Sequence, residues 1–73
     1  MEGTLLQELK EQIGAEINLV QERDAPYVYA MSKTTDGYAN LENRIAEKVL
    51  SAGKSIDEAI QAIENEINPN RID

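Results

Sequence analysis

Four carboxylates lie close together near the C-terminal end of the sequence, and they are the first candidates for chemistry: Asp57, Glu58, Glu64 and Glu66. Two carboxylates can transfer protons when a dry pocket separates their pKa values. Carboxylate oxygens can also bind calcium or magnesium. The helix expected at 55–68 carries these four and contains no Lys or Arg. Its outer side is therefore either an acidic docking face for a basic partner or a solvated helix exterior.

The composition excludes most other chemistry. The 73 residues contain no His and no Cys and carry a net charge of −7. Without these residues there is no imidazole for proton transfer near neutral pH and no thiolate for attack or zinc binding. An EF-hand loop is not found in the sequence. A domain this small has little room for a dry pocket, so we expect no enzyme, no catalytic residue, no cofactor and no metal site.

Three tyrosines are the only aromatic residues, and two of them, Tyr27 and Tyr29, alternate in a β-rich run. If Val28 and Ala30 point inward, the tyrosines form an exposed patch beside the loop at Asp24; otherwise they form the buried face. Tyrosine is common in interface hot spots because it combines large contact area with a hydroxyl. The predicted partner-binding set is therefore Asp24, Tyr27, Tyr29, Asp57, Glu58, Glu64 and Glu66.

The elements that would position these residues predict one α+β domain over 1–73. The order is helix, β-hairpin, helix and helix, with the helices on one face of a two-stranded or three-stranded antiparallel sheet. The first helix is expected at 4–13. It has a capping-box pair at Thr4 and Gln7, an apolar face at helical spacing, and Gly14 as a stop.

The hairpin is predicted at 16–31. The runs 17–21 and 27–31 are β-rich, and the residues between them, 22–26, include Asp24 and Pro26. Charged residues and proline between two such runs are typical of a hairpin loop. Asp36 and Gly37 are a further turn signal, which could add a short third strand.

The last two helices are predicted at 38–52 and 55–68, followed by a tail at 69–73. Gly53 is expected to end the first of them, and a capping box of Ser55 and Glu58 to begin the second. The apolar seam of the last helix has four-three-four spacing, through Ile56, Ile60, Ile63 and Ile67. Such a seam is typical of core packing, and its alternative use is a homodimer interface.

The size of the chain favours a partner. A domain of roughly 60 residues buries only about 60% of its unfolded surface, so its stability is marginal. A second subunit or a regular helical core would offset this weakness. Because no apolar run approaches the length that spans a bilayer and no basic leader is visible, we expect no membrane contact and a cytoplasmic location.

Residues 27–67 resemble a ribbon-helix-helix DNA-binding module. The resemblance rests on a strand, a helix, the turn Gly53-Lys54-Ser55 and a helix that begins Ile56-Asp57-Glu58. It implies an intertwined dimer whose paired strands enter the major groove. The strand departs from that pattern because it is apolar and aromatic. The net charge also opposes phosphate contacts, so direct binding of nucleic acid is disfavoured.

In size and sign of charge the chain is also similar to small acidic α+β proteins of phages and mobile elements. Such proteins often inhibit nucleic-acid-binding enzymes by presenting carboxylates where phosphates would lie. The sequence thus predicts a small non-catalytic inhibitor or protein-binding module that docks on a basic surface of a larger partner. The alternatives are a dimeric ribbon-type transcriptional regulator and a self-associating structural or accessory subunit.

Overall fold

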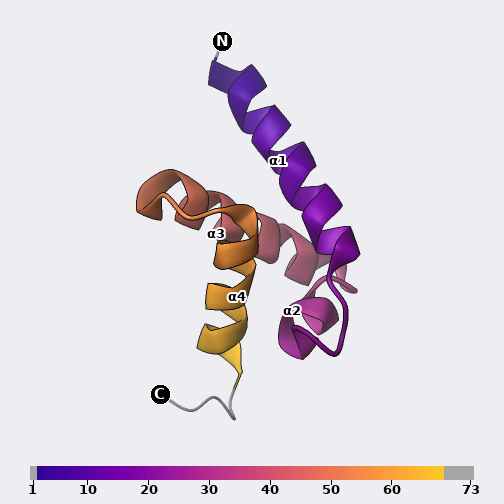
Figure 1. The fold of residues 1–73 in the computed structure, drawn as a ribbon. Coiled ribbons are helices and arrows are strands. Elements are labelled where there is room, and N and C mark those ends of the chain that lie inside the picture. The colour runs from indigo at the N-terminus through magenta and orange to yellow at the C-terminus, as the bar shows by residue number, and fades with distance from the viewer. Residues whose placement is uncertain (1, 69–73) are drawn as a thin grey trace.

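Four helices form the part of the chain that the computed structural model describes, residues 2–68 (Figure 1). They are α1 (Glu2–Leu19), α2 (Pro26–Met31), α3 (Thr35–Ala52) and α4 (Ile56–Ile67). Helix α3 is central, because α1, α2 and α4 all pack against it. The N-terminal half of α1 extends beyond the other helices (Figure 1). The predicted α+β fold is wrong, because residues 2–68 contain no strand.

Helix α1 passes through the point at which the sequence predicted its end. Ile13 and Ile17 lie four residues apart and are both buried, so the apolar stripe of the predicted helix continues for another turn. Gly14 therefore lies inside the helix. A Cβ atom there would lie 2.8 Å from the hydroxyl oxygen of Tyr38, so this glycine lets α3 approach the α1 backbone closely.

The predicted hairpin at 16–31 is replaced by the end of α1, a loop at 20–25 and the six-residue helix α2. Pro26 is the first residue of α2, where its fixed φ suits a helix and its missing N–H costs nothing. Val28 is fully buried in the core. The β-rich composition of 27–31 was misleading because burial and tertiary contacts can override the weak preferences of so short a segment.

Helix α3 begins three residues earlier than predicted. The hydroxyl of Thr34 accepts a hydrogen bond from the N–H of Gly37 at 3.0 Å, which caps the first turn. The possible third strand near Asp36 is therefore also wrong, because Asp36 and Gly37 lie in this turn. A Cβ atom at Gly37 would collide with the carbonyl oxygen of Met31. Gly53 ends α3 with a φ of 67°, as its predicted role requires.

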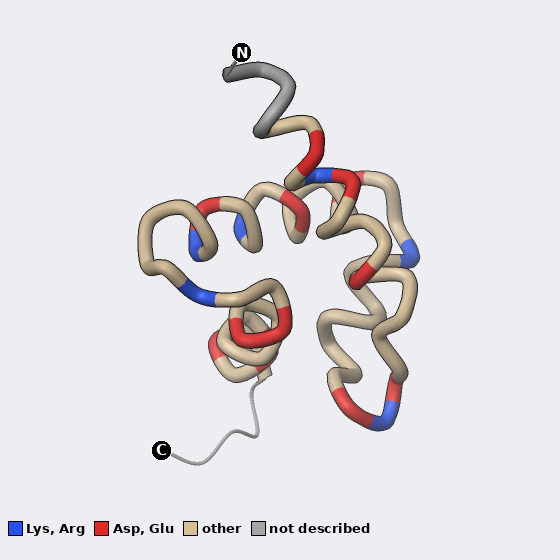
Figure 2. Tube along the Cα trace, turned by 45° about the horizontal axis from the view of Figure 1, so that its top comes forward, with Lys and Arg blue, Asp and Glu red and all other residues tan. Residues whose placement is uncertain are grey.

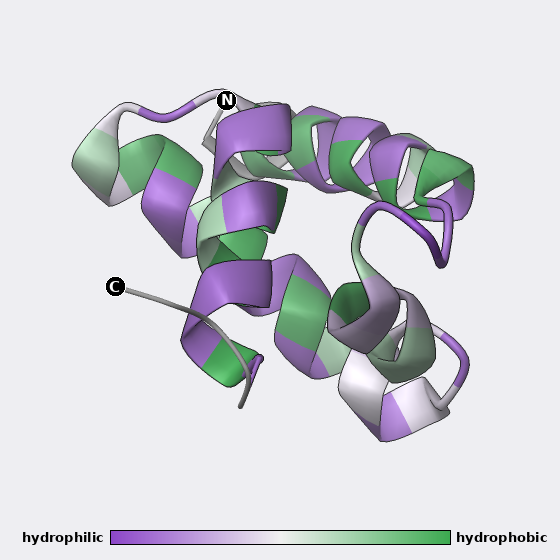
Figure 3. Cartoon of the chain, turned by 60° about the horizontal axis from the view of Figure 1, so that its bottom comes forward, coloured by the Kyte–Doolittle hydropathy of each residue, from purple (hydrophilic) through white to green (hydrophobic). Residues whose placement is uncertain are grey.

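The capping box predicted for the last helix is confirmed. Ser55 and Glu58 each accept a hydrogen bond from the other residue's backbone N–H, and α4 begins at Ile56. The isoleucine seam is core, because Ile60 and Ile63 are buried. Apolar segments of the helices turn toward one another (Figure 3), and the buried set is Ile13, Ile17, Ala25, Val28, Leu41, Ile45, Ala46, Ala59, Ile60 and Ile63. The predicted tail at 69–73 lies outside the described residues.

Candidate binding surfaces

Glu64 is the one buried acidic side chain of the described residues, and it caps another helix. Its Oε1 accepts hydrogen bonds from the N–H groups of Tyr27 at 3.0 Å and Val28 at 2.9 Å. Its side chain is buried between α4 and α2, with the residue 4% exposed. The prediction that Glu64 lies on the outer, solvated side of the last helix is therefore wrong.

The reason for this contact lies at the start of α2. The N-cap residue of α2 is Ala25, which has no side-chain oxygen, so the first N–H groups of the helix need an acceptor from elsewhere. The Glu64 carboxylate supplies it, and a negative charge at a helix N-terminus is also favourable. A sequence signal existed: Glu64 is four residues after Ile60, and this spacing places it beside the apolar seam.

Glu58 and Glu66 are both engaged by other groups of the chain. Glu58 belongs to the capping box of α4. Glu66 accepts a hydrogen bond from the Lys48 ammonium of α3 at 2.6 Å, and the lysine side chain is partly buried in this ion pair. Lys48 therefore offsets part of the negative charge that the sequence predicted for the last helix.

The capping box makes stability depend on pH through Glu58. The Ser55 backbone N–H, and secondarily its hydroxyl, lowers the pKa of Glu58 below its ordinary value of 4.5. A depressed folded-state pKa stabilises the fold above the unfolded-state value, and this stabilisation is lost as pH falls through the folded-state pKa. We expect Glu58→Gln to lower the melting temperature at pH 7, with the difference from wild type beginning to shrink below the ordinary pKa of 4.5 and disappearing only once the pH has fallen through the lowered folded-state pKa.

Thermal melts of both proteins across this pH range measure the effect. Glu47→Gln makes the same charge change at an exposed position of α3 and controls for net charge. A difference between wild type and Glu58→Gln that is the same at every pH would contradict the assignment.

The two predicted interface tyrosines, Tyr27 and Tyr29, do not lie side by side on one face of a strand. Both lie in α2 and are half-buried. Residues two apart on a helix point in widely different directions, so Tyr27 and Tyr29 do not share a face as they would on a strand. The Lys33 ammonium lies 4.4 Å from the centre of the Tyr29 ring, a cation–π contact. The strand that the ribbon-helix-helix resemblance requires is thus a helix.

Two of the predicted acidic residues do come together. Asp24, from the loop after α1, and Asp57, from the first turn of α4, line one depression of about 180 Å³. We call this depression the acidic groove; its other lining residues are Glu16, Leu19, Val20, Gln21, Ile60 and Gln61. Acidic positions on α1, on this loop and on α4 are visible in Figure 2. Every charged residue of the lining is acidic.

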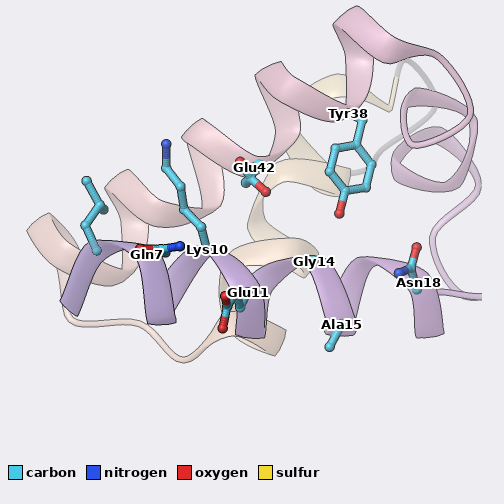
Figure 4. Close-up of a pocket in the computed structure, with 9 residues that line it drawn as sticks. Gln7, Lys10, Glu11, Gly14, Ala15, Asn18, Tyr38 and Glu42 are labelled. Carbon is cyan, nitrogen blue, oxygen red and sulfur yellow. The ribbon is translucent and has the colours of Figure 1, made fainter. Parts of the chain in front are cut away.

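A larger groove of about 700 Å³ lies between α1 and α3 (Figure 4). One side of α1 lines it from Leu6 to Asn18, and α3 contributes Tyr38 and Glu42. The Tyr38 side chain projects from α3 toward α1 near Gly14 (Figure 4). Lys10 lies among the carboxylates of this groove, so the lining carries both positive and negative charge. The groove therefore does not favour a positively charged partner over a negatively charged one.

Two further features, a metal site and a membrane-spanning helix, are not found among the described residues. Residues 2–68 contain no cluster of three or more acidic side chains arranged to hold a metal ion. None of the four described helices is both long enough and apolar enough to cross a membrane. Comparisons of the chain with protein-family models, curated proteins and solved structures found no match.

Proposed function

We propose that this protein is a small non-catalytic binding module that docks on a basic surface of a larger protein partner. The observation that supports this most is the acidic groove. Three carboxylates, those of Glu16, Asp24 and Asp57, line it from three different segments of the chain, and no Lys or Arg does. Carboxylates that line one groove add to one another's potential and attract cationic surfaces.

Two of the three carboxylates of the groove, those of Asp24 and Asp57, belong to exposed residues that a partner can reach. Glu58, Glu64 and Glu66 are engaged within the chain, but Asp57 is exposed. Asp24 lies 3.9 Å from the Arg23 side chain, and both side chains of this pair are largely exposed. An exposed pair of this kind contributes little free energy, so a partner's cation can replace Arg23 at low cost.

The partner class follows from charge. The chain carries a net charge of −7, so encounter with a basic surface is accelerated and encounter with another acidic surface is slowed. Proteins that bind nucleic acids present such basic surfaces. Inhibition of a protein of this class, with carboxylates in place of phosphates, is the form of the activity that we propose.

A homodimer through the isoleucine seam is not part of this proposal. Ile60 and Ile63 are already buried within the core of a single chain, and Ile56 and Ile67 pack against that core. A dimer that used these side chains would have to open the core of each subunit first.

The test is capture of partners from a lysate, followed by binding measurements with each purified captured protein over a series of salt concentrations. We expect affinity to fall as salt rises, because salt screens exposed charges. We expect the double reversal Asp24→Lys/Asp57→Lys to slow association about tenfold or more, since electrostatic steering contributes roughly 10- to 1,000-fold to on-rates.

The matched control is Glu8→Lys/Glu47→Lys, which makes the same change of net charge at exposed positions outside the acidic groove. We expect its effect on association to be clearly smaller. Equal effects of the two double variants would show that only net charge matters. No effect of either variant, together with salt-independent binding, would refute the proposed function.

A further inference from the structure

We propose that the acidic groove binds an amphipathic basic segment of the partner, with an aliphatic side chain seated on Leu19 between lysine or arginine side chains. This inference rests on the proposed function, because it takes the partner to be basic. It adds that recognition is not purely electrostatic: one apolar contact at a defined place decides which basic segment is bound.

The apolar part of the groove consists of Leu19, Val20 and Ile60. Leu19 is the last residue of α1 and is 72% exposed, more than any other large hydrophobic residue whose burial is described. Ile60 is buried and belongs to the core, so the groove places the exposed leucine beside a rigid part of the fold. An aliphatic side chain bound here would remove apolar surface from water on both partners.

The charges around this apolar part select what accompanies the aliphatic side chain. Glu16 lies one turn before Leu19 on α1, Asp24 lies in the following loop, and Asp57 lies on α4 across the groove. Lysine and arginine can lay their methylene stems on apolar surface and place the charged head at its rim. A segment with such residues on both sides of an aliphatic residue complements the groove in both polarity and charge.

An acidic segment is disfavoured for the same reason. It would bring its carboxylates toward the three of the groove, and like charges held close together repel. A wholly apolar segment would desolvate these carboxylates without replacing their hydrogen bonds to water. The combination of Leu19 with three carboxylates therefore fits a basic amphipathic segment better than either alternative.

Two synthetic peptides of equal positive charge provide the test. One consists of lysine and alanine, and the other has a single central leucine in place of an alanine. With the wild-type protein we expect the leucine peptide to bind about tenfold more tightly, measured by titration calorimetry or by chemical-shift changes of the Leu19 and Ile60 methyl groups. Tenfold corresponds to about 1.4 kcal/mol.

Leu19→Ser should abolish this tenfold preference, because it should weaken binding of the leucine peptide about tenfold more than binding of the alanine peptide. Leu50→Ser is the matched control, because Leu50 is 67% exposed and lies outside the groove, and it should keep the preference. Circular dichroism checks that both variants stay folded. Asp24→Lys/Asp57→Lys should weaken both peptides.

The outcomes separate this inference from the proposed function. If both peptides bind the wild type equally and the charge reversal weakens both, the leucine contact is refuted and a basic partner is still supported. If neither peptide responds to the reversal, the basic partner is refuted as well. Failure of both peptides to bind at millimolar concentration refutes the groove as their site, and the salt-dependent capture above then decides the function separately.

Discussion

Replacement of Glu64 by alanine is expected to lower the free energy of unfolding by about 1–3 kcal/mol, the cost of leaving buried hydrogen-bonding groups without a partner. The N–H groups of Tyr27 and Val28 would both lose their acceptor, and Ala25 offers no side chain to replace it. A helix of six residues is not stable by itself in water, so α2 should detach before the rest of the fold unfolds.

Urea unfolding measures the global loss, and amide hydrogen exchange at Tyr27 and Val28 measures the local one. Glu64→Gln keeps an oxygen acceptor without the charge, and we expect it to cost less than the alanine variant. Asn65→Ala is the control for helix α4, because Asn65 is the exposed neighbour of Glu64. Unchanged exchange at these two amides in Glu64→Ala would show that the carboxylate does not hold α2.

Replacement of Leu41 by alanine should have the largest effect on stability, a loss of about 2–5 kcal/mol. Leu41 is fully buried in the middle of α3, against which the other three helices pack. For 73 residues the whole free energy of unfolding is expected to be about 4–11 kcal/mol, so this one substitution removes much of it.

The matched control is Leu50→Ala in the same helix. Leu50 is 67% exposed, and surface substitutions usually change stability by less than about 0.5 kcal/mol. In urea unfolding, the midpoint of Leu41→Ala should therefore lie at a much lower urea concentration than the midpoint of Leu50→Ala. Similar midpoints for the two variants would contradict the placement of Leu41 in the core.

The strongest local signals in the sequence agreed with the structure. The capping box of Ser55 and Glu58 begins α4, and Gly53 ends α3 as predicted, with a positive φ. Both features depend on contacts within a few residues of chain, so the residues themselves carry the information. The isoleucine seam was also recognisable as core, because its spacing matches one face of a helix.

The errors arose where local preferences are weak and distant contacts decide. Glycine commonly follows the end of a helix, so Gly14 was predicted to end the first one. In the structure Gly14 lies within α1, and the Tyr38 side chain of α3 packs against it. The run Tyr27–Met31 has the composition of a strand and forms a helix. The prediction that Tyr27 and Tyr29 share one face followed from the predicted hairpin, and it was wrong for the same reason.

The candidate binding site was likewise predicted only in part from the sequence. Asp24 and Asp57 were both predicted as partner-binding residues, but nothing in the sequence indicated that they line one groove together with Glu16 and Leu19. Glu64 was grouped with them by its charge alone. Its position beside Ile60 on the helix was the only sign that it would be buried.

The sequence by itself determined the acidity and the absence of imidazole and thiol chemistry, because these follow from composition. It also determined where α3 ends and where α4 begins, because helix caps depend on residues that are neighbours in the chain. Only the tertiary structure decided that 26–31 is a helix. The physical reason is that the backbone N–H groups at its start need an acceptor, and the Glu64 carboxylate that accepts from them comes from a helix far along the chain.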